Sequence, residues 1–104
     1  LEFYESLTPE QRRWLNEQYQ LFRQLPPERQ EEMRRLYRRF SAIPEDRKTA
    51  LQREFYLLRR LSEAQRRARL DSKEFRARFT PQERRLLADM ADVVAAAPAG
   101  ANAQ

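Results

Sequence analysis

The sequence predicts an all-α protein of five short helices, and three observations lead to this fold class. The chain of 104 residues has a single glycine among many Arg, Glu, Gln and Leu residues, a composition typical of helical proteins. Apolar residues within each segment follow helical spacing. A helix-start signal recurs every 18 residues, with its leading apolar residue at Leu7, Leu25, Ile43, Leu61 and Phe79. A fixed period of this length indicates a repeat architecture.

Each start signal has a physical explanation. Thr8, Ser62 and Thr80 carry a side-chain oxygen that can accept a hydrogen bond from the free amides of a first helical turn. Gln or Glu follows three residues later, as in a capping box. Prolines begin the helices of the second and third signals. Because proline disfavours helical geometry in the residue before it, each signal should end one helix and begin the next.

The elements follow in chain order. We expect unbroken helices over residues 9–24, 27–40, 44–60 and 81–96. The fourth repeat differs, because Arg69, Lys73 and Arg76 occupy its stripe positions. Residues 71–74 also resemble a second capping box within that repeat. We therefore expect the fourth repeat to break in two near Leu70, with Phe75 on a short second helix.

Packing of these helices as antiparallel hairpins would bury their apolar stripes. Residues 1–96 would then form one helical repeat domain, and residues 97–104 a disordered tail. A continuous rod would also keep the stripe in phase, but a proline inside a helix costs about 3 kcal/mol. The predicted core consists of Trp14, Leu15, Tyr19, Phe22, Leu36, Phe40, Leu51, Phe55, Leu58, Leu87 and Met90.

The composition argues against catalysis and cofactor binding. The chain has no histidine and no cysteine, which are the usual bases, nucleophiles and soft metal ligands. Its paired carboxylates mostly lie at helix starts or on polar faces, so we expect no enzyme activity, no cofactor and no metal site. No apolar run approaches the roughly 20 residues of a membrane-spanning helix. The chain begins at Leu1 rather than Met, so a preceding signal peptide would be missing from this fragment.

Positive charge is concentrated in the middle of the chain. Residues 1–32 contain 4 basic and 7 acidic side chains, whereas residues 33–60 contain 9 basic and 3 acidic ones. Such a segment could hold a phosphate backbone. The helix dipole equally favours arginines in last turns, where they form a solvated face. The candidate nucleic-acid contacts within residues 34–67 are Arg34, Arg35, Arg38, Arg39, Arg59, Arg60, Arg66 and Arg67.

The irregular fourth repeat is the predicted partner-binding surface. Its candidate contacts are Arg69, Lys73, Phe75, Arg76 and Phe79. If this face turns outward, the phenylalanines could anchor a groove rimmed by arginines, suited to an acidic amphipathic helix. Alternatively, both phenylalanines fill the core and the cations meet acidic groups, for which Asp89 and Asp92 are candidates.

The start signals also resemble those of a known family. Units such as Leu25-Pro26-Pro27-Glu28-Arg29, with the segment spanning residues 69–84, resemble an uncharacterised bacterial family, domain of unknown function number thirty-one-oh-six. The resemblance extends over most of residues 7–94. It implies a helical, exported protein and assigns no activity or binding residues. The chain departs from the family pattern at Ile43-Pro44 and Leu61-Ser62, where the second proline is missing.

A weaker resemblance concerns the first start signal. Leu7-Thr8-Pro9-Glu10-Gln11 is similar to the LTxxQ motif of small periplasmic chaperones and envelope-stress sensors. A capping box explains the same residues without a shared function. Both resemblances indicate the cell envelope.

The expected function is therefore binding rather than catalysis. We expect a periplasmic or secreted helical module that contacts another protein, in envelope stress or in a chaperone-like role. The alternative is a nucleic-acid-binding protein that uses residues 34–67, with a cytoplasmic location as the alternative to export. The sequence leaves a homodimer open.

Overall fold

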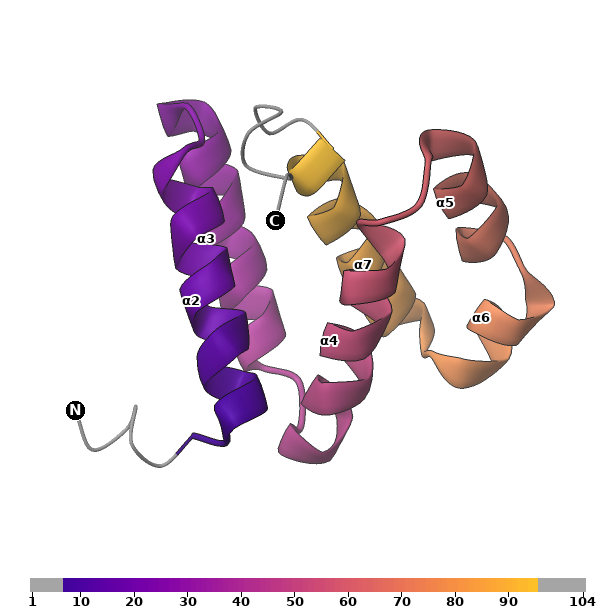
Figure 1. Ribbon diagram of the computed structural model, residues 1–104. Helices are drawn as coiled ribbons and strands as arrows, with labels where there is room; N and C mark the ends of the chain where they lie inside the picture. The colour runs from indigo at the N-terminus through magenta and orange to yellow at the C-terminus, as the bar shows by residue number, and fades with distance from the viewer. Residues whose placement is uncertain (1–6, 96–104) are drawn as a thin grey trace.

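The computed structural model describes residues 7–95, which are helical and contain no strand, so the predicted fold class is confirmed. Residues 1–6 and 96–104, including the predicted tail, lie outside the described part. The expected break in the fourth repeat turns five helices into six within the described residues. They are α2 (Pro9–Arg23), α3 (Pro27–Ser41), α4 (Glu45–Leu58), α5 (Glu63–Leu70), α6 (Lys73–Arg78) and α7 (Pro81–Ala95) (Figure 1).

The start signals act as helix caps. Thr8 Oγ1 accepts a hydrogen bond from the Gln11 amide at 3.1 Å, and Gln11 Oε1 accepts one from the Thr8 amide at 2.9 Å. The same reciprocal capping box begins α5 at Ser62 and α7 at Thr80. Pro26 and Pro44 precede α3 and α4 without a side-chain cap. Ser72 caps α6 by accepting from the Phe75 amide at 3.1 Å, so the fourth repeat breaks where expected.

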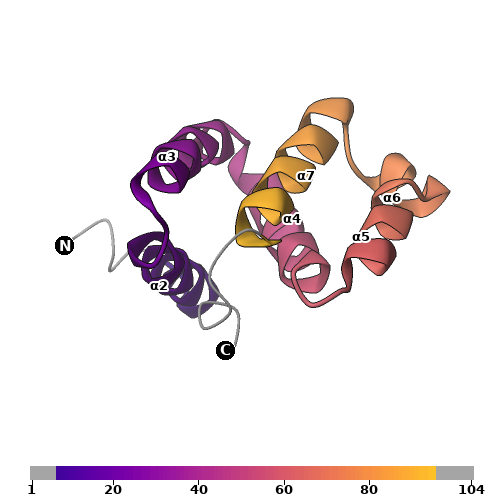
Figure 2. The same cartoon turned by 90° about the horizontal axis from the view of Figure 1, so that it is seen from above.

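The helices do not pack in the order in which they follow one another along the chain. α2 and α3 form an antiparallel hairpin, but α7 packs against both α3 and α4 (Figures 1 and 2). The Arg39–Asp89 ion pair joins the end of α3 to the middle of α7, and the Arg47–Glu83 pair joins the first turns of α4 and α7. In a simple stack each repeat would contact its sequence neighbours. Here α5 and α6 lead the chain back, so that the last helix completes a core begun by the second and third repeats.

The core surrounds the single tryptophan. The Trp14 ring lies 5.4 Å from the Phe40 and Phe55 rings and 5.6 Å from Tyr56, measured between centroids. Eight of the eleven predicted core residues are buried as expected, and Leu15 and Phe22 pack partly buried at its edge. The prediction for Tyr19 was wrong, because this side chain is 59% exposed.

The geometry of α2 explains the error. Its buried stripe is Trp14, Gln18 and Leu21, and Leu25 continues it beyond the helix end. Tyr19 follows Gln18 by one residue, which places it about 100° further around the helix. The polar Gln18 therefore lies inside and the aromatic Tyr19 outside.

Candidate functional site

The predicted partner-binding segment of the fourth repeat is largely built into the fold. Phe75 and Phe79 are each only 3% exposed, and their ring centroids lie 5.1 Å apart. Both rings fill the core, as in the second of the two sequence-based alternatives. They do not line an open groove in this structure.

The acid that meets the fourth repeat is Glu54 of α4. Its side chain is 2% exposed and accepts hydrogen bonds from Arg69 Nη2 at 3.0 Å and Arg78 Nη1 at 3.3 Å, with a further bond from Arg69 Nε. The expected acidic groups, Asp89 and Asp92, are not the partners of Arg69. A buried carboxylate requires such pairing because its desolvation is costly. The hydrogen bond with Glu54 raises the pKa of Arg69 above its ordinary value.

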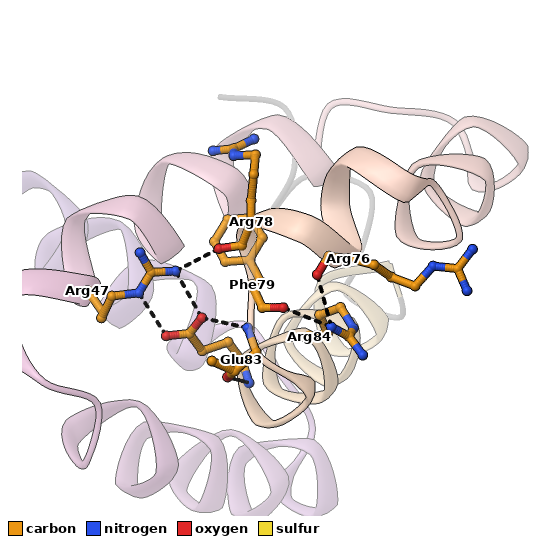
Figure 3. A network of polar contacts seen from close by, with 7 residues as sticks. Arg47, Arg76, Arg78, Phe79, Glu83 and Arg84 are labelled. Carbon is orange, nitrogen blue, oxygen red and sulfur yellow. Dashed lines mark hydrogen bonds and ion pairs between the residues drawn. The ribbon is translucent and has the colours of Figure 1, made fainter.

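A second buried carboxylate, Glu83, joins α4 to the start of α7. Arg47 donates to it from Nε at 3.0 Å and from Nη2 at 2.9 Å, in the bidentate geometry that suits a guanidinium (Figure 3). The hydrogen bond from Arg47 lowers the pKa of Glu83, burial opposes this shift, and the Thr80 amide adds to it. Glu83 thus caps α7 and fixes α4 with the same carboxylate.

Arginines also hold the carboxyl end of α6. Arg47 Nη2 donates to the Arg78 carbonyl at 2.9 Å, and Arg84 Nη1 donates to the Phe79 carbonyl at 2.8 Å. The guanidinium carbons of Arg78 and Arg47 lie 5.0 and 5.7 Å from the Phe79 ring centroid. The Arg76 guanidinium points away from this network (Figure 3). Of the five predicted contacts, only the exposed Lys73 and Arg76 present their charges without a carboxylate partner among the described residues.

The arginines of the middle segment do not form one surface. Four of the eight nucleic-acid candidates pair with acids, as Arg34–Glu31, Arg39–Asp89, Arg59–Glu17 and Arg67–Glu63. Arg35, Arg38, Arg60 and Arg66 have no ion pair within residues 7–95. Arg35 and Arg38 lie on α3. Arg60 lies in the connection between α4 and α5, and Arg66 lies on α5, which is on the far side of α4 and α7 from α3 (Figure 2). The structure therefore divides this charge between two ends of the molecule.

The contacts of Glu17 hold two helices together. It accepts the Tyr56 hydroxyl at 2.6 Å and Arg59 Nη2 at 3.0 Å, which joins α2 to α4. Burial and the hydrogen bond to Glu17 raise the pKa of Tyr56 to about 12. Arg59 is thus part of a structural contact.

A shallow hollow of about 300 Å³ lies between α3 and α7. Its lining carries charges of both signs. Arg39 pairs with Asp89 at 2.7 Å, and Arg35 and Asp92 lack an ion pair in the described chain. The lining residues are Glu32, Arg35, Leu36, Arg39, Asp89 and Asp92. Such a wall offers complementary charges to a protein surface and repels part of any uniformly charged ligand.

The sequence missed a further surface on the first hairpin. Leu15, Tyr19 and Phe22 are spaced i, i+4 and i+7, so they share one side of α2. Arg23 lies over the Tyr19 ring at 5.9 Å, and Arg34 of α3 lies over the Phe22 ring at 5.1 Å. We name Leu15, Tyr19, Phe22, Arg34 and Tyr37 the outer hairpin face. The polar Gln18 within the competing stripe was the signal that could have revealed it.

The described residues contain neither a cluster of metal-ligating side chains nor a membrane-spanning helix. Within residues 7–95 no three acidic, histidine or cysteine side chains are placed to share a metal ion. No helix there combines the length and apolar character needed to cross a membrane.

Comparison with known proteins identifies a family. The family model described as "Protein of unknown function (DUF3106)" matches residues 1–53, which include α2, α3 and the first part of α4. The match does not extend to residues 69–84, which carried much of the resemblance noted from the sequence. No curated protein and no solved structure matches the chain.

Proposed function

The chain belongs to the DUF3106 family of proteins of unknown function, and from this premise we propose that it is a non-catalytic helical module that binds another protein. We propose a periplasmic or secreted location, with a role in envelope stress or a chaperone-like role. Export is the expectation that accompanies the family resemblance, and the weaker similarity of residues 7–11 to the LTxxQ motif agrees with it.

One observation carries the choice of a protein partner. Charges of both signs line the hollow between α3 and α7, where Arg35 and Arg39 of α3 lie with Asp89 and Asp92 of α7. Acidic groups beside the arginines would repel a phosphate backbone, whereas a protein surface can match both signs. This pattern supports protein binding over nucleic-acid binding.

Affinity capture from the native envelope fraction tests the proposal. The full chain should retain a specific protein that can be identified and then shown to bind again when both proteins are purified. Failure to reconstitute any captured protein from purified components would contradict the proposal.

The four arginines that make no ion pair within residues 7–95 favour the nucleic-acid alternative. Titration of labelled RNA and duplex DNA with the full chain, at low and at physiological ionic strength, separates the two functions. We expect weak binding that is lost at about 0.15 M salt. Tight binding that persists at physiological ionic strength would favour nucleic-acid binding over protein binding.

Location is tested independently. The product of the whole coding sequence should be released with the periplasmic or secreted fraction. Recovery with cytoplasmic markers would contradict export while leaving protein binding open.

A further inference from the structure

The outer hairpin face carries the most exposed apolar surface of the described chain. Tyr19 is the one large apolar side chain classed as exposed within residues 7–95. Leu15 and Phe22 are half-buried on either side of it along α2. Tyrosine and arginine are enriched among the residues that contribute most to protein interfaces, and Tyr19 and Arg23 lie together here.

The second helix of the hairpin extends this face. Gln30 Nε2 donates to the Phe22 carbonyl at 3.1 Å, and Arg34 lies over the Phe22 ring, so this side of α3 adjoins α2. Tyr37 follows on the next turn of α3 and is half-buried. Burial raises the pKa of the Tyr37 phenol above its ordinary value. α4 and α7 pack against the opposite side of the hairpin (Figure 2).

The charges on and beside the outer hairpin face indicate which kind of partner can bind there. Arg34 is neutralised by Glu31 at 2.8 Å. Arg23 lies over Tyr19, Arg38 follows Arg34 by one helical turn, and neither makes an ion pair in the described chain. The uncompensated charge is therefore positive. A second copy docked face to face would bring like charges together, which disfavours self-association.

We propose that the outer hairpin face binds an amphipathic helix of another protein, whose apolar side is flanked by carboxylates. Apolar side chains at i, i+4 and i+7 of such a helix would cover Leu15, Tyr19 and Phe22, and its carboxylates would meet Arg23 and Arg38. This proposal rests on the proposed function and assigns it a surface and a class of partner.

Two synthetic helical peptides provide the test. Both carry leucines at i, i+4 and i+7, and they differ only in having glutamates or lysines beside the leucines. Each labelled peptide is titrated with the full chain and with the variants Tyr19→Ala, Arg23→Glu and Arg85→Glu. Arg85 is the matched control, because it is exposed on α7 and makes no ion pair within residues 7–95. Emission from Trp14 in the core reports that each variant is folded.

We expect the glutamate peptide to bind about ten-fold more tightly than the lysine peptide. Tyr19→Ala should weaken binding about ten-fold, and Arg23→Glu should reduce or reverse the preference for glutamate. Arg85→Glu should behave as wild type. Equal binding by the Tyr19→Ala variant, or an equal loss on Arg85→Glu, would overturn the proposal.

Two further outcomes would show that a different partner binds the outer hairpin face. Dimerisation of the full chain that is abolished by Tyr19→Ala would assign the face to a second copy. Peptide binding that appears only after deletion of residues 1–6, which include Leu1, Phe3 and Tyr4, would assign it to the chain's own amino-terminal segment. If a captured and identified protein binds wild type and Tyr19→Ala equally, the proposed function stands and this surface is refuted.

Discussion

Gln18 and Tyr19 are neighbours on α2 and have opposite environments. The Gln18 side chain is 1% exposed, and neither its Oε1 nor its Nε2 makes a hydrogen bond within residues 7–95. Tyr19 is largely exposed beside Arg23. Residue type alone predicts the reverse arrangement, and the angular position around the helix decides which side chain is buried.

Replacing Gln18 should therefore stabilise the protein. Gln18→Leu removes two buried polar atoms that lack partners, and we expect the free energy of unfolding to rise by about 1 kcal/mol. Urea unfolding measures this change, with Gln20→Leu at an exposed position of α2 as the control. A loss of stability would show that the amide has hydrogen-bonded partners, such as buried water.

Phe55 and Tyr19 provide a second comparison at the residue scale. Phe55 is 1% exposed and packs edge-on against Trp14, so Phe55→Ala should reduce the free energy of unfolding by about 3–5 kcal/mol. Tyr19→Ala should change it by less than about 0.5 kcal/mol. Thermal or urea unfolding of both variants checks this, and similar losses for the two would contradict the placement of Tyr19 outside the core.

At the scale of helices, the sequence predicted most of what the structure has. The helix expected over residues 9–24 is Pro9–Arg23, and the one expected over residues 44–60 is Glu45–Leu58. Start signals succeed because caps and prolines act on the nearest turn. The sequence did not indicate that Glu54 is the carboxylate that pairs with Arg69 of the fourth repeat. Glu54 lies 15 residues before Arg69, and no local rule links the two positions.

Two arginines of the fourth repeat should respond differently to charge reversal. Arg69→Glu places a carboxylate beside the buried Glu54 and should lower the free energy of unfolding by about 3 kcal/mol or more. Arg76 is exposed, its Nη2 bonds only the Asp71 carbonyl, and Arg76→Glu should cost less than about 1 kcal/mol. Thermal unfolding of both variants measures these losses of stability. Equal, small losses would mean that Arg69 is a surface residue available to partners.

Glu83 should make stability depend on pH in the acid range. Its pKa in the folded protein lies below the ordinary value of 4.5, mainly because Arg47 donates hydrogen bonds to the carboxylate. Its contribution is therefore fully present above about pH 4.5 and is lost as the pH falls through the lowered pKa. Glu83→Gln should be less stable than wild type at neutral pH, and the difference should narrow below that value.

The Glu83→Gln variant isolates the ion pair from the helix cap. Glutamine occupies the same capping position at Gln11 and Gln65, so the cap should persist. Glu28→Gln, at an exposed position without an ion pair in the described chain, is the control and should follow the wild-type curve. A constant difference between Glu83→Gln and wild type across the acid range would contradict this account.

At the scale of the whole molecule, the sequence predicted an 18-residue repeat, but it did not predict that α7 would pack against both α3 and α4. An 18-residue period specifies similar helices without specifying which of them meet. α5 and α6 reverse the chain and bring α7 between α3 and α4. The surroundings of the candidate contacts also depend on this packing, which the sequence does not specify. Phe75 and Phe79 lie in the core, and the arginines of the basic middle are divided between α3, the end of α4 with its connection to α5, and α5. Leu15, Tyr19 and Phe22 of the outer hairpin face were expected to be buried.

The central claim is that α7 returns to α3, which closes one core, and that no helix within residues 7–95 covers the far side of the first hairpin. The chain has no cysteine, so Arg35→Cys gives a single attachment point for a nitroxide on α3. Amide broadening by this label, measured by NMR, tests the claim directly, because Arg35 shares the hollow with Asp89 and Asp92. The structure predicts strong broadening of α7 amides around residues 89–92 and little on α5. Broadening of α5 with α7 unaffected would contradict it.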